Sequence, residues 1–187
     1  MSFCTVIASV LVFALACTTA GGAVRPTVEV APQVRVPLRD GWRVQPQSSR
    51  NLTELVRDEG GKPAARASIS AEPRLDHDEA VRRLREIAEE REGERSFTEL
   101  CGWPALVRRA KVTSAPPARP SADGGDEPQP AAAEVITIAV AIAATVVRIE
   151  GPATAGDGLL ELARSLTCPT APDAGATRQE IESLQKP

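Results

Sequence analysis

Cysteine and histidine, two residue types common in nucleophilic and metal sites, are few in this chain: it has four cysteines and a single histidine. Cys17 is the most informative of them, because it closes the apolar run from Val6 to Ala16 and small residues follow it. A run of this length is typical of an export signal and falls well short of the roughly 20 residues that a membrane-spanning helix needs. The pattern predicts a bacterial lipoprotein signal peptide over residues 1–16, with the thiol of Cys17 lipidated after cleavage.

The cleavage site leaves alternatives open. A strong lipoprotein site has Leu three places before the cysteine, whereas this chain has Ala14 there. Ala14-Leu15-Ala16 fits the small-x-small pattern of ordinary signal cleavage equally well, which would give a secreted protein, and an uncleaved anchor is a third alternative. Residues 1–16 also contain no Lys or Arg. We expect a lipoprotein anchored in a membrane of the bacterial cell envelope, and Thr18-Thr19 after the cysteine favour the outer membrane.

Cys101 and Cys168 are the other cysteines of the predicted mature chain. In an oxidising compartment, two spare cysteines at the ends of ordered elements often pair, so we expect a disulfide bond between them. Two buried free thiols are the alternative. A catalytic role for Cys101 is disfavoured, because the sequence shows no partner residues for it.

His77 lies in the run Asp76-His77-Asp78-Glu79, which resembles a metal cluster. Consecutive helix residues point in different directions, however, so these side chains cannot all face one ion. Helix capping accounts better for Asp76 and Glu79. The sequence also contains no Gly-x-Ser-x-Gly elbow and no phosphate-binding glycine loop. We therefore expect no metal site, no cofactor and no enzymatic activity.

Charge and aromatic content bear on the class of partner. The formal net charge is −3, whereas a nucleic-acid footprint needs a basic face. After signal cleavage the aromatic residues would be Trp42, Phe97 and Trp103, and the two tryptophans are expected to be core or loop anchors. Nucleic acid is therefore not an expected partner.

Alternation of apolar and polar residues predicts the strands of the domain. Strands are expected at 34–38 and 65–71, and the turn at 58–61 indicates a hairpin between the second strand and residues 51–57, which fit strand or short helix equally well. A run apolar on both faces, 135–140, suits a central strand. Further strands are expected from Trp42, at 97–100 and 106–112, and at 145–149 as the hairpin partner of the central run.

Two helices are expected to pack on these strands. Asp76 and Glu79 form a capping-box pattern before the first, which Gly93 ends. Asp157 is expected to cap the second. The first helix would bury Val81, Leu84, Ile87 and Ala88 and carry ion pairs Arg82–Glu86 and Arg85–Glu89. The second would bury Leu159, Leu160, Leu162, Ala163 and Leu166.

The remaining segments are expected to be loops. Residues 17–33 predict a flexible tether, the proline-rich residues 114–133 a disordered loop, and residues 169–187 a polar tail in which 177–184 could be transiently helical. One domain would then span residues 34–168. The order of elements is that of an α+β fold, with an antiparallel sheet and helices packed on it.

Several short motifs resemble the PsbP-like superfamily, which includes small bacterial lipoproteins of the DcrB type. They are the stretch from Val34 to Trp42, Gly102-Trp103-Pro104-Ala105, the stretch Val146–Gly151, and the closing Leu159–Leu166 helix. The proline-rich insertion departs from a compact member. The resemblance implies an α/β/α sandwich with a binding or assembly role and no shared catalytic residues.

These observations predict a lipid-anchored envelope protein with a non-catalytic accessory role that binds a protein partner. An envelope hydrolase whose site the sequence does not reveal is one alternative. The other is a carrier of a small apolar ligand, which would need a cavity between helix 77–91 and the sheet. A pocket with convergent polar residues would favour the enzyme, and a flat or apolar exposed face would favour the binder.

Overall fold

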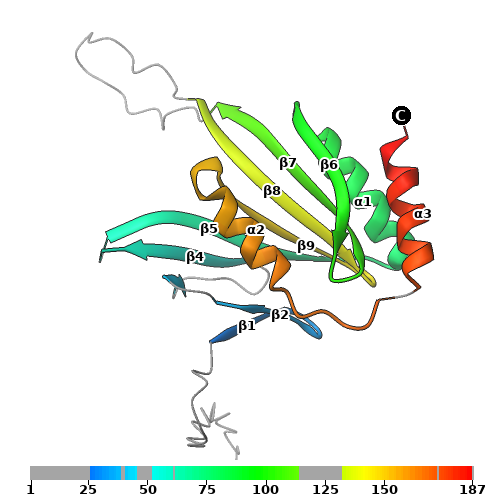
Figure 1. Ribbon diagram of the computed structural model, residues 1–187, viewed down its shortest axis with the longest axis horizontal. Helices are drawn as coiled ribbons and strands as arrows, with labels where there is room; N and C mark the ends of the chain where they lie inside the picture. The colour runs from blue at the N-terminus through cyan, green and yellow to red at the C-terminus, as the bar shows by residue number, and fades with distance from the viewer. Residues whose placement is uncertain are drawn as a thin grey trace, which may run out of the picture.

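The computed structural model describes residues 26–38, 41–45, 52–60, 62–113, 132–171 and 173–186 (Figure 1). The predicted signal peptide, Cys17 and most of the predicted proline-rich loop lie outside the described residues.

A seven-stranded antiparallel sheet forms the centre of the protein, in the order β3-β4-β5-β9-β8-β7-β6. The α+β class and the antiparallel sheet predicted from the sequence are confirmed. The strands are β3 (Trp42–Val44), β4 (Leu52–Glu59), β5 (Lys62–Pro73), β6 (Gly93–Leu100), β7 (Trp103–Thr113), β8 (Ala132–Ile142) and β9 (Thr145–Pro152). The ambiguous segment 51–57 is thus a strand, and the expected β4–β5 and β8–β9 hairpins are present.

Both faces of the sheet are covered, as the apolar sequence of β8 predicts. Ile138 packs into the core on one face and Ala139 into the core on the other, and both are fully buried. Successive strand residues point to opposite faces, so a strand that is mostly apolar on both faces is expected to lie between two layers. β8 accordingly pairs with β7 on one side and β9 on the other.

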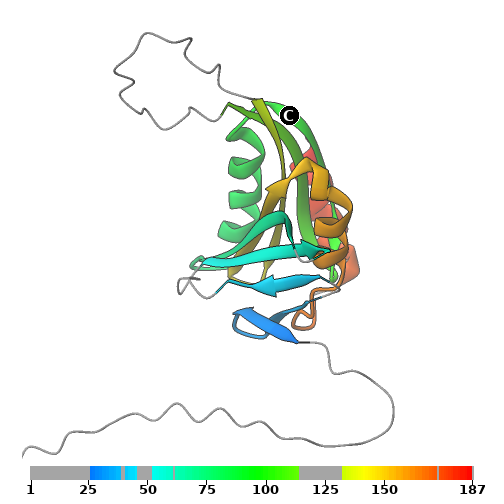
Figure 2. The same ribbon diagram turned by 90° about the vertical axis from the view of Figure 1, so that its left-hand side faces the viewer.

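Helices α1 (His77–Glu89) and α3 (Ala174–Gln185) cover one face, which we call the α1 face. Helix α2 (Gly156–Arg164), which follows the 3-10 turn Ala153–Ala155, covers the opposite α2 face together with a two-stranded ribbon of β1 (Thr27–Ala31) and β2 (Val34–Pro37). Figure 2 shows α1 and α2 on opposite sides of the sheet. The molecule therefore has three layers, helix, sheet and helix.

Two segments expected to be irregular are ordered elements. β1 lies inside the predicted tether 17–33 and pairs with β2, because Val28 and Val30 pack against the core of the α2 face. The predicted tail 169–187, in which a transient helix was expected at 177–184, contains the longer helix α3, which buries Leu184 against α1 and the sheet. Residues 132–133, expected in the loop, begin β8. These elements depend on contacts with distant residues, which local composition does not show.

The capping box of α1 is present, with the Glu79 N–H donating to Asp76 Oδ1 at 2.8 Å. The helix ends at Glu89, and Gly93 instead begins β6, where a Cβ would lie 2.2 Å from the carbonyl oxygen of Arg109. The cap predicted at Asp157 is wrong: Ala155 occupies that position and Asp157 lies in the first turn of α2. Within α1, the ion pairs observed are Arg82–Glu79 and Arg83–Glu86 in place of those expected.

Candidate functional site

Cys101 and Cys168 form the predicted disulfide bond, with their Cα atoms 6.1 Å apart. The bond ties the β6–β7 turn to the segment that follows α2. Both tryptophans are buried, as expected, and the Trp103 indole N–H donates to the carbonyl oxygen of Pro169 at 3.2 Å. The disulfide and this hydrogen bond therefore join the same end of the sheet to the segment that follows α2.

His77 holds the C-terminal helix in place. Its Nε2 atom lies 3.2 Å from both carboxylate oxygens of Glu180 on α3, and its Nδ1 atom lies 3.1 Å from the carbonyl oxygen of Ala143. The imidazole also meets the Trp103 ring edge-on, with centroids 5.2 Å apart. Among the described residues, no group of three or more His, Cys, Asp or Glu side chains could hold a metal ion.

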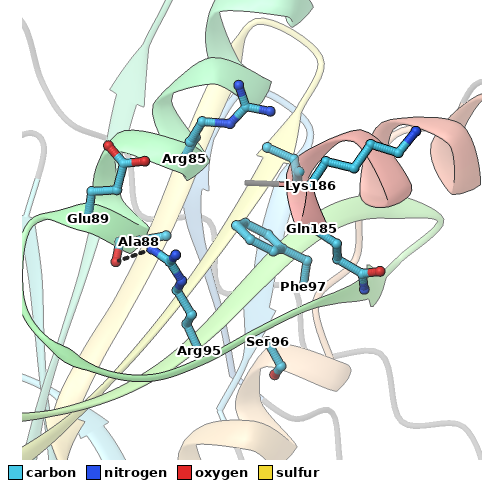
Figure 3. Close-up of a pocket in the computed structure, with 9 residues that line it drawn as sticks. Arg85, Ala88, Glu89, Arg95, Ser96, Phe97, Gln185 and Lys186 are labelled. Carbon is cyan, nitrogen blue, oxygen red and sulfur yellow. Dashed lines mark hydrogen bonds between the residues drawn. The ribbon is translucent and has the colours of Figure 1, made fainter.

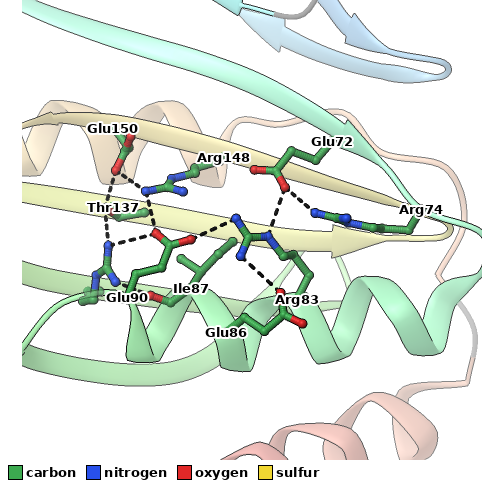
Figure 4. A network of polar contacts seen from close by, with 10 residues as sticks. Glu72, Arg74, Arg83, Glu86, Ile87, Glu90, Thr137, Arg148 and Glu150 are labelled. Atoms are coloured by element: carbon green, nitrogen blue, oxygen red, sulfur yellow. Dashed lines mark hydrogen bonds and ion pairs between the residues drawn. The ribbon is translucent and has the colours of Figure 1, made fainter.

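A network of ion pairs lies between α1 and the sheet (Figure 4). Glu90, just after α1, lies 2.9 Å from Arg83, 3.2 Å from Arg148 and 4.0 Å from the buried Arg108. The network extends from β5 through α1 to β9. Its charged members are Arg74, Arg83, Arg108 and Arg148 with Glu72, Glu86, Glu90 and Glu150. Positive and negative charges are equal in number in this network, and its ion pairs join α1 to the sheet.

The pKa values in this network show the strength of the pairing. Burial alone would raise the pKa of Glu72, but hydrogen bonds and charge from Arg83 and Arg74 outweigh it and lower the pKa. The pKa of Glu150 is lowered in the same way, against burial, by hydrogen bonds from Arg148 and Thr137. Both carboxylates are therefore held in their ionised form.

Arginines from two neighbouring strands cap the C-terminal end of α1. The last turn of this helix contains no basic residue of its own. Arg108 on β7 donates to the carbonyl oxygen of Ile87, and Arg95 on β6 donates to that of Ala88 at 3.5 Å. Cations are favourable there because the last carbonyls of a helix lack partners and carry partial negative charge. Arg95 thereby links the outermost strand to the helix layer.

A groove opens to solvent beside Arg95, between the end of α1, β6 and the end of α3. Its volume is about 400 Å³. Figure 3 shows the Phe97 ring at its centre, between Arg95 and the last residues of α3. The lining residues are Arg85, Ala88, Glu89, Arg95, Ser96, Phe97, Leu184, Gln185 and Lys186. We call this the Phe97 groove.

The Phe97 groove carries unbalanced positive charge. Arg85, Arg95 and Lys186 line it with a single carboxylate, Glu89. Arg85 donates to the backbone carbonyl of Ser183 at 2.9 Å, and Arg95 contacts only a carbonyl as well. Within the part of the chain that the structure describes, neither guanidinium has a carboxylate within ion-pair distance, in contrast to the balanced network next to them. The groove thus presents unpaired cations around an aromatic ring.

β6 forms one edge of the sheet and is exposed along most of its length. A second groove, of about 410 Å³, borders the same strand on the α2 face. It is lined by Glu94, Arg95, Ser96, Val107, Arg109, Ile136 and Leu160. An edge strand with a groove on each face has the geometry by which sheets accept an extended segment, whose alternate side chains enter the two grooves.

The sequence predicts a strand at Phe97 but does not identify this surface. The available signal was the spacing of Arg95, Phe97 and Glu99, three residues of one strand face. That signal has meaning only when the strand is known to lie at the edge of the sheet, which the sequence does not reveal.

Comparison with known proteins defines the fold and no family. A scan against protein-family models and a search of curated proteins found no match. A solved structure from Bacteroides thetaiotaomicron VPI-5482 is similar with a TM-score of 0.52 and 8% identity; the match covers 76% of this chain and 48% of the other. This chain therefore spans about half the length of that protein. No helix in the described ranges is both long and apolar enough to cross a bilayer.

Proposed function

We propose that this protein is a lipid-anchored, non-catalytic protein of the bacterial cell envelope that binds a protein partner along β6. The observation that carries the proposal is the open β6 edge, with its unpaired cations and a groove on each face. Backbone groups of an edge strand that point away from the sheet can pair with another chain, which gives affinity, and the grooves give specificity. The resemblance to PsbP-like lipoproteins is consistent with such a role.

The predicted lipid would act as the tether. Cys17 precedes β1 by a short stretch of sequence, so acylation there would hold the domain close to a membrane. A single lipid chain gives weak membrane binding, whereas several acyl chains on one terminus anchor a protein stably. Confinement to a membrane surface raises the effective concentration of partners and allows a modest interface to suffice.

The carrier alternative needs an apolar cavity between α1 and the sheet. That space holds the fully buried side chains of Leu84, Ile87 and Leu106 and, beside them, the ion-pair network. The observations favour a binding role at the edge of the sheet over a role inside it.

Site-specific photocrosslinking in intact cells tests the proposal. A photoreactive amino acid at Thr98, which is exposed on β6, is expected to give a defined covalent adduct with an envelope protein, a second copy of this chain included. The same probe at Val44, on the strand at the opposite edge of the sheet, is the matched control. Equal adducts at both positions, or none at Thr98, would contradict the proposed function.

A further inference from the structure

β6 is an edge strand of the kind that other chains can extend. It contains eight residues and is paired by β7 on one side, while the strand order of the described sheet ends with it on the other. Natural proteins commonly protect such edges with charged side chains. β6 carries charges at Glu94, Arg95 and Glu99, so the question is which incoming strand these charges would reject and which they would accept.

Two of the three charges of β6 are arranged symmetrically about an aromatic residue. The strand contains Arg95-Ser96-Phe97-Thr98-Glu99, with opposite charges two residues before and two residues after Phe97. The register with β7 places Phe97 opposite Leu106 of the α1-face core and Arg95 opposite Arg108 of the ion-pair network. Arg95, Phe97 and Glu99 therefore share the α1 face, and Ser96 and Thr98 share the other face.

An antiparallel copy of the same strand complements this pattern in one register. If two β6 strands pair about Phe97, each Arg95 lies opposite Glu99 of the other copy, and the two Phe97 rings lie opposite each other. Ser96 then lies opposite Thr98. Residues directly opposite in an antiparallel pair share a face and contact each other, so both ion pairs and the aromatic pair form at once. A shift of the register by about four residues would instead oppose two Arg95 or two Glu99 side chains.

We infer that the partner of β6 is a second copy of this chain, in a two-fold symmetric dimer whose two sheets join edge to edge through Phe97. This inference rests on the proposed function and names its partner. Arg95 lacks a carboxylate partner, and Glu99 lacks a cationic one, among the residues that the structure describes. In the dimer, Arg95 of each copy pairs with Glu99 of the other copy. A two-fold interface uses the same patch on both copies, as this self-complementary strand requires.

The remaining elements are compatible with this pairing. α3 contacts β7 as well as β6, which places it over the α1 face. Ser96, Thr98 and Glu99 are exposed, so α3 does not cover their side chains. Figure 3 shows Arg95 and Phe97 pointing to one side of β6 and Ser96 to the other, as the pairing requires.

The test measures the mass of the full chain, extracted from membranes in detergent, by sedimentation velocity. The unmodified protein is expected to be a dimer. Arg95→Glu and Glu99→Arg each place two like-charged pairs in the interface and should weaken association about tenfold or more. A 1:1 mixture of these two variants restores both ion pairs, so it is expected to dimerise again, as is the double variant that carries both changes.

Matched variants separate this effect from damage to the fold. Arg95 also caps α1, so Arg95→Glu could lower stability, whereas Glu99→Arg does not touch that contact. Arg66→Glu makes the same charge reversal at an exposed residue of β5, a strand that three others separate from β6, and should leave the dimer intact. The unfolding temperature of every variant identifies any that fails to fold, and Glu99→Arg then carries the test.

The outcomes distinguish this inference from the proposed function. A monomer that still gives a Thr98 adduct with a different protein overturns the dimer and leaves the binding role standing. A monomer with no specific adduct overturns both. A dimer that resists both single variants, or two monomeric variants that fail to associate when mixed, shows that the charges of β6 do not form the interface and overturns the inference.

Discussion

Among the described residues, Arg108 is the one charged residue that is buried, and 1% of its surface is exposed. It reaches three structural partners: the last turn of α1, Thr137 on β8, and Glu90. Burial lowers its pKa more than the charge of Glu90 raises it. A buried guanidinium needs such partners, because an isolated buried charge lowers the stability of the folded state by several kcal/mol.

Replacement of Arg108 by Ala is therefore expected to lower the free energy of unfolding by about 3 kcal/mol, since Ile87 and Thr137 lose a donor and a cavity opens. Urea unfolding measures the change. Arg109→Ala, on the next residue of the same strand, removes an exposed side chain and should change stability by less than about 0.5 kcal/mol. Similar losses for both variants would show that the network contributes little.

Glu72 and Glu150 give the fold an acid-sensitive component. Their pKa values are lower in the folded protein than in the unfolded chain, where Glu has a pKa of about 4.3. The stabilisation is fully present above that unfolded value and is lost as the pH falls through the folded pKa. Stability is thus expected to fall below about pH 4.

Replacing Glu150 by Gln isolates this contribution. The variant is expected to be less stable than the unmodified protein at pH 7, and the difference should shrink as the pH falls from about 5 to about 3. Urea unfolding across this range measures it. Glu182→Gln, on the exposed side of α3, should follow the unmodified curve. A Glu150→Gln difference that stays constant with pH would contradict the assigned pKa direction.

At the scale of secondary structure, elements distant in sequence terminate and anchor one another. α1 receives its C-terminal cations from β6 and β7, and α3 is docked by His77 of α1 and by the Thr177 hydroxyl, which donates to the carbonyl oxygen of Gly102 at 2.9 Å. The disulfide joins the β6–β7 turn to the segment between α2 and α3. The edge strand is therefore held by the disulfide next to it, by the hydrogen bond from Arg95 and by apolar contacts.

Loss of the disulfide is expected to destabilise the domain without changing its fold. The cysteines are 67 residues apart, and closing a loop of that length contributes about 4 kcal/mol in the chain-entropy model. The variant carrying Cys101→Ser and Cys168→Ser should unfold at a correspondingly lower denaturant concentration. Reduction of the unmodified protein is the matched control and should give the same loss. Stability that is unchanged by either treatment would argue against the bond.

At the scale of the whole molecule, the proposed lipid anchor and the disulfide together predict the mass of the mature protein. The protein extracted from membranes under non-reducing conditions should have the mass of residues 17–187 plus acyl chains, less the two hydrogens lost on forming the disulfide. Intact-mass spectrometry measures this value. Cys17→Ser is the control and should lose the acyl chains. An unacylated mass from the unmodified protein would rule out lipidation at Cys17 and direct the search to the periplasm or the medium.

An element of this fold could be predicted from the sequence where neighbouring residues determine it, and not where contacts with distant residues do. The capping box of α1, the doubly apolar β8 and the hairpin before β9 were all predictable, because each depends on neighbouring residues. β1 was not, and α3 was expected only as a transient helix over 177–184, since their few apolar residues become informative only when a partner surface is present. The cap predicted at Asp157 was wrong because α2 already begins at Gly156, directly after the 3-10 turn.

The sequence by itself determined the α+β class, the main strands, the first helix and the pairing of Cys101 with Cys168. Only the tertiary structure decided which strand lies at the edge, which arginines are paired, and where the Phe97 groove opens. Arg95 and Arg108 differ little as residues in a sequence, yet one is exposed and the other buried. Periodicity and capping act over a few residues, whereas burial, charge pairing and strand order are set by segments that meet only when the chain folds.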